Sequence, residues 1–299
     1  MYYFLKILIS IILIIILLLF IIKNKEKFNN NLKSKKIAFC FLIYDNINHE
    51  ELWYKFFKNV NKNKYNIYIH YKKNIPLKFF ESNKIKNIVS TKWCGSSLII
   101  AQNNLLKQAI KDPENKHFIF VSNSCIPLKS FNYIYNDLNQ EYSYFNKLKI
   151  RSNIKQFDKS IKAYKASQWC ILNRKHTNII LKSYNLIKTL LNYFDNTNIF
   201  KGFGCPDEYI YITVLYHLGL ENELILTDNL SSGATTFTGN PNRNNNIKFK
   251  DSIFKKTPNN YSYICEKELN FLLNSKSLFG RKFNYECKGL ENLEKKIFN

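Results

Sequence analysis

An apolar segment that stops abruptly in small polar residues most constrains how this chain can fold. Residues 118–121 are continuously aromatic or β-branched, which predicts a short strand buried on both faces of a sheet. The sequence Ser-Asn-Ser-Cys follows at 122–125, and Pro127 cannot continue a central strand because it lacks an amide hydrogen. Ligands of open α/β sheets bind beyond the carboxyl ends of the strands. We therefore expect the chemistry of this protein at the edge formed by residues 122–125.

The residues before this segment alternate between strand and helix patterns. A continuous apolar run opens the domain at residue 36, and Leu52, Trp53, Phe56 and Phe57 follow at helical spacing. The pattern predicts, in order, a buried parallel strand at 36–44, a helix at 49–60, a strand at 65–70, a short strand at 87–90, an amphipathic helix at 98–110 and the strand at 118–121. No G-x-G-x-x-G follows the first strand, so the order is more typical of a nucleotide-sugar-binding sheet than of a dinucleotide-binding one.

The second half of the chain is less regular. The pattern predicts a helix at 131–138, an irregular stretch at 141–158, a strand-like segment at 163–172, one long helix at 177–193 and a short basic turn at 277–283. Residues 227–250 are rich in Ser, Gly, Thr, Asn and Pro, and a loop of that length inside a domain is usually functional or disordered.

The amino-terminal segment predicts a membrane anchor. Residues 7–22 are an unbroken apolar run that extends to Tyr2 if Lys6 reaches the interface, which gives about the 20 residues needed to span a bilayer. Lys and Asn follow the run instead of the small residues of a signal-peptidase site, which favours an uncleaved anchor. We expect an anchor at 1–22, a polar stem at 23–35 and a catalytic domain at 36–299. Lysines flank both ends of the run, so charge alone leaves its orientation open.

The strongly basic composition has two interpretations. The 45 Lys and Arg residues against 22 Asp and Glu give a formal charge of +23, which would attract nucleic acid or an anionic membrane. Lys, Asn and Ile are, however, over-used throughout the chain, as a biased nucleotide composition would produce. No arginine-rich stripe, zinc-ligand spacing or RNA-binding aromatic signature accompanies the charge, so we favour solvated surfaces over nucleic-acid binding.

Cysteines and histidines give weaker signals. The seven cysteines include no C-x-x-C pair, and their pairing cannot be deduced. Cys125 at the strand end could be a nucleophile, but without an identifiable activating base a buried or disulfide-bonded cysteine is the commoner case. His70 and His176 are interpreted as structural residues with satisfied hydrogen bonds. Asn229 and Asn260 begin glycosylation sequons that could be used only in a lumenal domain.

Two short segments carry the charges best suited to catalysis. Asp207 and Glu208 follow a glycine-containing loop and Pro206, where a carboxylate could act as general base; the alternative is that they cap a helix and complement its dipole. Arg281 and Lys282 could bind a diphosphate, or could simply be solvated surface. An acidic D-x-D, the usual metal anchor for a sugar nucleotide, is absent at residues 122–125, whose neutral groups are poor ligands for Mg²⁺.

Several of these motifs together resemble one known family. The order and spacing resemble those of the core-2/I-branching β-N-acetylglucosaminyltransferases, most closely the plant-type branch, over about residues 36–285. The motifs are Lys36-Ile-Ala-Phe-Cys-Phe-Leu, Trp53 with Phe56-Phe57, Ile67-Tyr-Ile-His70, Trp93-Cys-Gly, Leu105-Leu106, Phe118-Ile-Phe-Val-Ser-Asn-Ser-Cys-Ile-Pro-Leu128, Ser167-Gln-Trp169, Asn173-Arg-Lys-His176 and Pro206-Asp-Glu208.

This resemblance implies a GT-A-like fold with helices on both faces of a Rossmann-like sheet, and inverting transfer of a sugar from a UDP-sugar to a glycan or glycoprotein hydroxyl. It also implies a type II membrane protein of the Golgi or secretory pathway that needs no metal ion or other cofactor. Glu208 matches the general base, and Lys282 with Arg281 beside it matches the cation on the diphosphate. The donor and acceptor crevice would include Ser122, Asn123, Ser124, Trp93, Trp169 and Asp207.

The sequence departs from the family pattern in two places. The family's tryptophan before the long loop is replaced by Thr227-Asp-Asn-Leu230, and a second basic residue expected near Asn259 is not matched. The sugar, the acceptor and the linkage therefore stay open. The alternative is a catalytically degenerate, membrane-tethered protein that binds glycans or nucleic acid.

Overall fold

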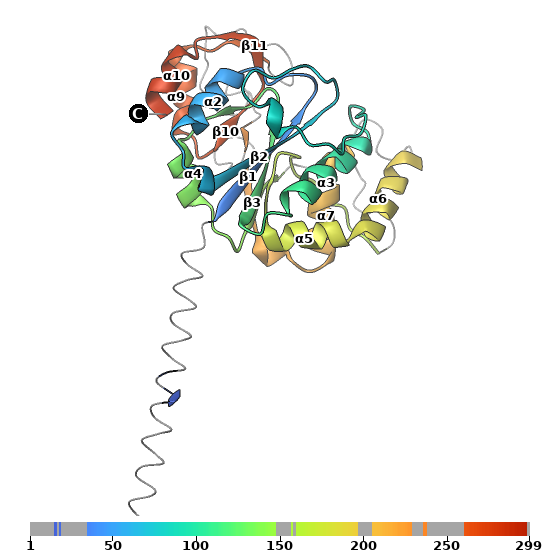
Figure 1. The fold of residues 1–299 in the computed structure, drawn as a ribbon. Coiled ribbons are helices and arrows are strands. Elements are labelled where there is room, and N and C mark those ends of the chain that lie inside the picture. Colours follow the sequence, from blue (N-terminus) through green and yellow to red (C-terminus); the bar gives the residue numbers. More distant parts are fainter. Residues whose placement is uncertain are drawn as a thin grey trace, which may run out of the picture. The chain divides into compact units, whose positions relative to one another are not determined.

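The computed structural model of the chain describes residues 35–147, 157, 160–196, 205–228, 236–237 and 260–297, together with Ile15, Ile16 and Leu18. Contacts divide the chain after Lys35, and residues 36–299 form one unit (Figure 1). Within the described parts, no helix is long and apolar enough to cross a membrane. The predicted anchor and stem lie, except for those three residues and Lys35, outside the described residues.

A mixed six-stranded sheet organises the unit, with the strand order β2-β1-β3-β6-β5-β7. β1 pairs in parallel with β2 and β3, β6 runs antiparallel to both β3 and β5, and β5 pairs in parallel with β7. The strands are β1 (Lys36–Ile43), β2 (Tyr65–Tyr71), β3 (Asn115–Ser122), β5 (Ser143–Lys147), β6 (Ile171–Asn173) and β7 (Leu224–Asp228). The α/β class is confirmed, and the sheet is mixed because β6 reverses direction.

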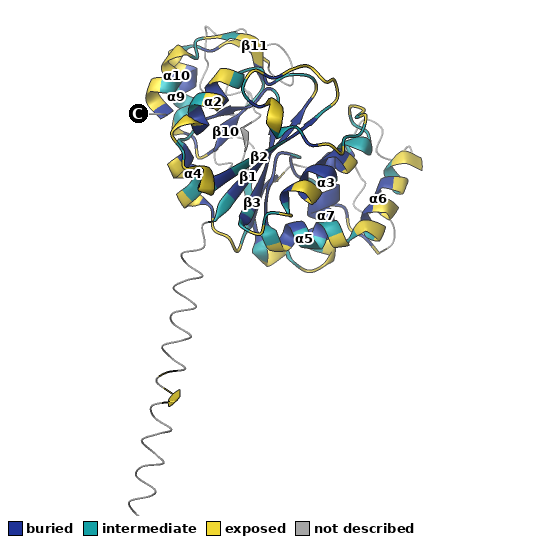
Figure 2. Ribbon diagram, viewed as in Figure 1, coloured by how far each residue is buried: buried dark blue, intermediate teal, exposed yellow. Residues whose placement is uncertain are grey.

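Helices cover both faces of this sheet (Figures 1 and 2). They are α2 (Glu50–Lys58), α3 (Ser97–Ala109), α4 (Phe131–Asp137), α5 (Arg174–Lys182), α6 (Tyr184–Asn196) and α7 (Ile210–His217), with 3-10 turns at Lys62–Lys64, Glu81–Asn83, Pro206–Glu208 and Glu221–Glu223. Alternate residues of a strand face opposite sides. Phe39 and Phe41 therefore pack with Trp53 of α2 on one face, while Phe118 and Phe120 pack with α3 and α7 on the other.

Two smaller sheets complete the unit near its carboxyl end. β4 (Ile126–Pro127), β10 (Phe279–Gly280) and β8 (Thr236–Phe237) form a three-stranded sheet in which β4 is an edge strand. β9 (Tyr261–Tyr263) pairs with β11 (Phe283–Lys288), and α9 (Glu266–Asn274) and α10 (Glu291–Ile297) pack beside them. The prediction from Pro127 is confirmed, because β3 ends at Ser122 and the proline lies on an edge.

The predicted strands at 36–44, 65–70 and 118–121 and the helices at 49–60, 98–110 and 131–138 are confirmed to within a few residues. The prediction of a strand at 87–90 is wrong. These residues form a loop, in which the amide of Val89 donates to Nε2 of His70 at 3.0 Å. The stretch 141–158 is not wholly irregular, because β5 lies within it, and of 163–172 only the last residues enter a strand, β6. The long loop at 227–250 falls mostly outside the described residues.

The single long helix predicted at 177–193 is also wrong. The chain forms two helices, α5 and α6, which meet at Ser183. The Ser183 hydroxyl donates to the carbonyl of Ile179 at 2.8 Å. Serine side chains compete in this way with the regular backbone bonds of a helix. Apolar residues recur at helical spacing on both sides of Ser183, so the spacing did not predict the break.

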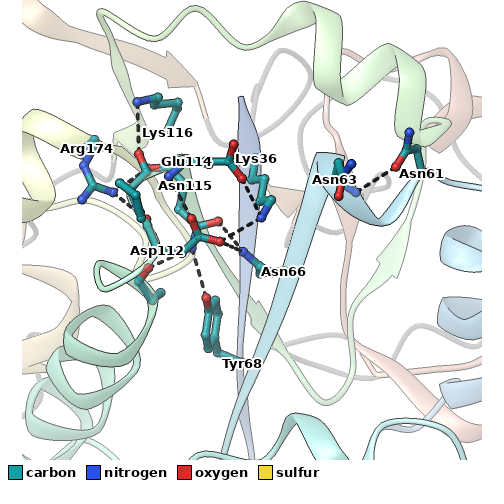
Figure 3. Close-up of polar contacts among 12 residues, drawn as sticks. Lys36, Asn61, Asn63, Asn66, Tyr68, Asp112, Glu114, Asn115, Lys116 and Arg174 are labelled. Atoms are coloured by element: carbon teal, nitrogen blue, oxygen red, sulfur yellow. Dashed lines mark hydrogen bonds and ion pairs between the residues drawn. The ribbon is translucent and has the colours of Figure 1, made fainter. Parts of the chain in front are cut away.

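A polar network fastens the amino ends of the three parallel strands (Figure 3). Lys36 at the start of β1 forms ion pairs with Asp112 at 3.0 Å and Glu114 at 2.8 Å. Asn115 at the start of β3 accepts from Asn66 of β2 at 2.9 Å and donates to the hydroxyl of Tyr68 and the carbonyl of Ala109. Arg174 closes the network by donating to backbone carbonyls, among them those of Asp112 and Asn115. This edge is thus occupied by structural contacts, which leaves the opposite edge for chemistry.

Asn115 is fully buried, so its replacement tests how far the network stabilises the sheet. We expect Asn115→Leu, a change of similar size, to lower the free energy of unfolding by about 2–4 kcal/mol, because it removes three hydrogen bonds of a buried side chain and weakens the pairing of Asn66, Tyr68 and Ala109. Urea unfolding followed by circular dichroism measures this. The neighbouring Lys116→Ala, whose lost bond to Pro113 is solvent-exposed, should cost at most about 0.5 kcal/mol; equal losses in the two variants would contradict the assignment.

Candidate active site

The carboxyl end of β3 forms a small polar floor. The Ser122 hydroxyl lies 3.2 Å from the Ser124 hydroxyl and 3.2 Å from Sγ of Cys125, and all three residues are buried. Asn123 instead points to the neighbouring loop, where its side chain donates to Asn48 at 3.3 Å and its carbonyl accepts from the Asn48 amide at 2.9 Å. The floor therefore presents neutral hydroxyl and amide groups and no carboxylate.

Cys125 is a free and fully buried thiol. Burial raises the pKa of this thiol, and the nearby positive charge of Arg281 only partly opposes that effect. Its carbonyl accepts a hydrogen bond from the indole of Trp53 at 3.0 Å, which fixes the corner between β3 and β4. A raised pKa is the opposite of what a nucleophilic thiolate needs, so the geometry supports a structural role.

The turn between β10 and β11 carries Arg281 and Lys282 and lies against this floor. The amide of Phe283 donates to the carbonyl of Ser124 at 2.9 Å, and the side chain of Asn48 donates to the carbonyl of Phe283 at 2.7 Å. β4 and β10 pair immediately before the turn, with Gly280 opposite Ile126. A Cβ at Gly280 would lie 3.2 Å from the Phe283 ring, so the approach is close. Two segments that the sequence analysis selected separately are therefore neighbours.

Both basic side chains of this turn are partly removed from water. The Arg281 guanidinium lies 4.6 Å from the ring centroid of Trp169, and its Nε is buried without a hydrogen-bond partner among the described residues. Burial, and secondarily the charge of Arg281, lower the pKa of Lys282 to about 8. Two adjacent cations with spare donors form a site suited to an anion such as a diphosphate.

The Pro206–Glu208 turn brings a buried acid to the same place. Burial first, and then the charge of Glu208, raise the pKa of Asp207 to about 7, while Arg281 and Lys165 act in the opposite direction. Its Oδ1 is buried and has no partner among the described residues. Cys205 occupies the N-cap position of this turn and Tyr209 that of α7, so Asp207 caps neither helix. Buried atoms without a partner on two groups of opposite charge that influence each other's pKa are a signal of function.

Glu208 is more accessible and has a cationic partner. Its Oε2 lies 3.1 Å from Nζ of Lys165, with 30% of the glutamate side chain exposed. Its carbonyl accepts from the amide of Ala166 at 2.8 Å. Residues 165–169 therefore contact Glu208 at one end and, through Trp169, Arg281 at the other. The sequence analysis missed Lys165, because nothing in the spacing marks it except its closeness to the Ser167-Gln-Trp169 motif.

A disulfide between Cys94 and Cys205 joins a third loop to this turn. The cysteines are 111 residues apart in sequence, and their Cα atoms lie 4.5 Å apart. Trp93, next to Cys94, is 85% exposed. The bond was not deducible from seven unpatterned cysteines. It places the Trp93 loop beside the turn that carries Asp207 and Glu208.

His70 and His176 lie outside this group. Both ring nitrogens of His176 have partners, the Ser143 hydroxyl at 2.7 Å and Glu223 at 3.1 Å, as predicted. For His70 the prediction of satisfied hydrogen bonds is wrong in part, because Nε2 accepts from the Val89 amide but Nδ1 is buried without a partner among the described residues. Burial lowers the pKa of His70 to about 4. A cavity of about 610 Å³ lies elsewhere, between α4, α9 and α10, and no carboxylate lines it. Among the described residues, no three His, Cys, Asp or Glu side chains gather as a metal site.

Comparison with known proteins points to one family. A sequence model of the Core-2/I-Branching enzyme family matches residues 37–239. Glycosyltransferase BC10 of Oryza sativa subsp. japonica is 26% identical over 219 residues, which cover 63% of this chain and 55% of that protein. This chain thus matches only about half the length of that relative.

Two solved structures have low similarity to this chain. S. aureus TarS superimposes with a TM-score of 0.33 at 12% identity, covering 64% of this chain and 35% of that one. The apo structure of the bifunctional glycosyltransferase WbbM gives a TM-score of 0.37 at 12% identity, covering 83% and 45%. Scores of this size carry no argument about the site.

The raised pKa of Asp207 predicts a specific dependence of stability on pH. The carboxyl keeps its proton to about pH 7 in the folded chain but loses it near its ordinary value of 3.8 when unfolded. Its contribution to stability is therefore full below about pH 4 and is lost as the pH rises through 7. Asp207→Asn removes this loss, so the variant should gain stability relative to the wild type between pH 4 and 8. Thermal melting across that range measures the gain, with Asp137→Asn on an exposed site of α4 as the control; parallel profiles for all three proteins would contradict it.

Proposed function

The chain belongs to the Core-2/I-Branching enzyme family of glycosyltransferases, and we propose that it transfers a sugar from a UDP-sugar to a hydroxyl of a glycan or glycoprotein. The transferred sugar is N-acetylglucosamine or a related sugar, the anomeric configuration is inverted, and no metal ion takes part. The supporting observation is that residues 165–169 contact both the acidic turn at Glu208 and the basic turn at Arg281.

Glu208 is the general base of the proposed reaction. Its partly exposed carboxylate accepts the proton of the acceptor hydroxyl as that oxygen attacks the anomeric carbon, and the bond from this carbon to the UDP oxygen breaks. The bond from the Ala166 amide fixes the backbone of Glu208, and the ion pair with Lys165 orients its carboxylate. Orientation of this kind supplies much of the rate enhancement when two substrates must meet.

Lys282 and Arg281 act on the leaving group. The departing UDP carries more negative charge in the transition state than in the donor, and fixed cations stabilise that change. The floor of Ser122, Asn123 and Ser124 adds hydrogen-bonding groups without a negative charge that would repel the diphosphate. Metal independence is supported by this set of groups. The strand end carries neutral side chains where a D-x-D motif would place carboxylates, and the basic turn is hydrogen-bonded to that strand end.

The disulfide supports a lumenal location. Bonds of this kind persist in oxidising compartments and are rare in the cytosol. We therefore propose that residues 36–299 face the lumen of a Golgi-type secretory membrane, with residues 1–22 as the anchor of a type II protein. Charge alone left this orientation open, so the disulfide is the stronger argument.

Replacement of the base tests the mechanism. We expect Glu208→Gln to lower kcat for sugar transfer by about 10²-fold or more, because the amide cannot accept the proton, while UDP-sugar binding is retained. Release of UDP in the presence of acceptor measures turnover, with the exposed Glu221→Gln as the control. Transfer by wild-type protein should continue in EDTA; loss of activity on chelation, or full activity of Glu208→Gln, would overturn the mechanism.

The basic turn predicts how donor affinity depends on pH. Lys282→Ala should raise KM for the UDP-sugar by about tenfold or more through loss of a charge-assisted contact, whereas Lys288→Ala on the exposed part of β11 should not. Because the pKa of Lys282 is about 8, the wild-type KM should rise above that pH as the charge is lost. Lys282→Arg, which stays charged, should abolish this rise. A KM that is equally flat in wild type and Lys282→Arg would refute the role.

A further inference from the structure

We propose that Trp93 is an acceptor-binding platform, on which the second sugar of an oligosaccharide acceptor stacks while the first sugar meets Glu208. This inference rests on the proposed function and specifies its acceptor as a chain of at least two neutral sugars. It combines the exposed indole ring with the disulfide that joins its loop to the Glu208 turn.

The exposure of Trp93 is unusual within this chain. It is 85% exposed, whereas Trp53 and Trp169 are 0% and 5% exposed. Its ring stacks on no other described ring, and its indole nitrogen donates to no described group. Tryptophan contributes more than most residues when a partner covers it, because its large apolar faces lose water. A largely exposed indole near the proposed catalytic turn is therefore suited to binding a ligand.

Hydrogen bonds fix the backbone around Trp93, although its ring makes no such contact with the described residues. The amide of Lys92 donates to the Ser97 hydroxyl at 2.8 Å, and the amide of Gly95 donates to the carbonyl of Lys92 at 3.1 Å. The Ser96 hydroxyl donates to Asp195 of α6 at 2.7 Å. Cys94 has a φ of 58°, a left-handed conformation that is uncommon for any residue except glycine. Several contacts thus fix the position from which Trp93 projects, as a binding platform requires.

The disulfide limits the distance between the platform and the base. The Cα atoms of Cys94 and Cys205 lie 4.5 Å apart, and the amide of Glu208 bonds to the carbonyl of Cys205 at 2.9 Å across one tight turn. With about 3.8 Å between adjacent Cα atoms and about 2 Å of rise per residue in such a turn, the Cα atoms of Trp93 and Glu208 lie at most about 15 Å apart. This separation of backbone atoms is of the order that linked pyranose rings can span.

The chemistry of the ring selects the ligand. An indole face attracts the C–H face of a pyranose by dispersion and by release of water, while the sugar hydroxyls stay at the solvated rim. β-Linked galactosyl and N-acetylglucosaminyl residues present such a face. The platform carries no charge, so it favours neutral sugars and adds affinity for the acceptor without touching the donor.

The test compares acceptors of one and two sugars. The probes are the β-methyl glycosides of galactose and N-acetylglucosamine, and of lactose, N-acetyllactosamine and chitobiose, with full-length protein in detergent. Trp93→Ala should raise KM for the best disaccharide by about tenfold, leave monosaccharide transfer unchanged and leave acceptor-free hydrolysis of the UDP-sugar unchanged. Trp93→Phe should restore most of the disaccharide affinity. Tyr184→Ala, another exposed aromatic, is the control.

A second variant tests the coupling through the disulfide. The double change Cys94→Ala with Cys205→Ala removes the disulfide without leaving either partner as a new free thiol. In that background Trp93→Ala should have little further effect on the disaccharide KM, since interacting positions are not additive. The proposal is overturned if Trp93→Ala affects mono- and disaccharides equally, lowers hydrolysis to the same extent, or changes nothing.

Failure of the proposed function is distinguishable from failure of the platform. If the wild type neither transfers nor hydrolyses any UDP-sugar, the proposed function is wrong. Tryptophan fluorescence then decides on the platform, because Trp93 is the one exposed indole among three. A blue shift with the disaccharides that Trp93→Ala abolishes supports saccharide binding, and the absence of any shift overturns it.

Discussion

The site depends on the hydrogen-bonded contact between the end of β3 and the turn that follows β10. A strand edge that ends in Ser122 and Ser124 has no charge with which to hold a sugar nucleotide. The bond from the Phe283 amide to the Ser124 carbonyl adds that charge by fixing Arg281 and Lys282 beside it. Ser124 and Phe283 are far apart in the sequence, so the two segments meet only after the sheet and the carboxyl-terminal strands have formed. The strand end and the basic turn are therefore brought together by folding itself.

The contrast between the two ends of the parallel strands shows which polar groups are structural. At the amino ends, Lys36 pairs with Asp112, and the Asn66 side chain donates to both Asp112 and Asn115. At the carboxyl ends, Asp207 and Arg281 keep buried atoms without partners. Buried polar atoms without hydrogen bonds lower the stability of the fold. The network at the amino ends shows that this chain can pair such groups where the fold alone requires it. The unsatisfied edge is consistent with groups whose partners are parts of a substrate.

The sequence patterns predicted those elements that are determined by residues close together in the chain. The continuous apolar runs at 36–44 and 118–121 predicted β1 and β3, because strands buried on both faces need apolar residues at every position. β5 escaped notice because its polar sequence, Ser-Tyr-Phe-Asn-Lys, is a strand through its pairing with β7, a contact between distant segments. Lys165 and the disulfide were missed for the same reason. Glu208, Arg281 and Lys282 were selected by residue type and family pattern, but their relation to one another needed the fold.

The unoccupied charges also bear on the order of events during turnover. Burial first, and then the charge of Arg281, make the charged form of Lys282 costly, as its lowered pKa reflects. A bound anion such as a diphosphate offsets this cost by its opposite charge, so anion binding stabilises the basic turn. In the proposed mechanism the same attraction acts on the product, since UDP keeps its phosphates after the sugar has left. Departure of UDP must then break the charge-assisted contacts to Arg281 and Lys282, which makes product release a costly step beside the chemical one.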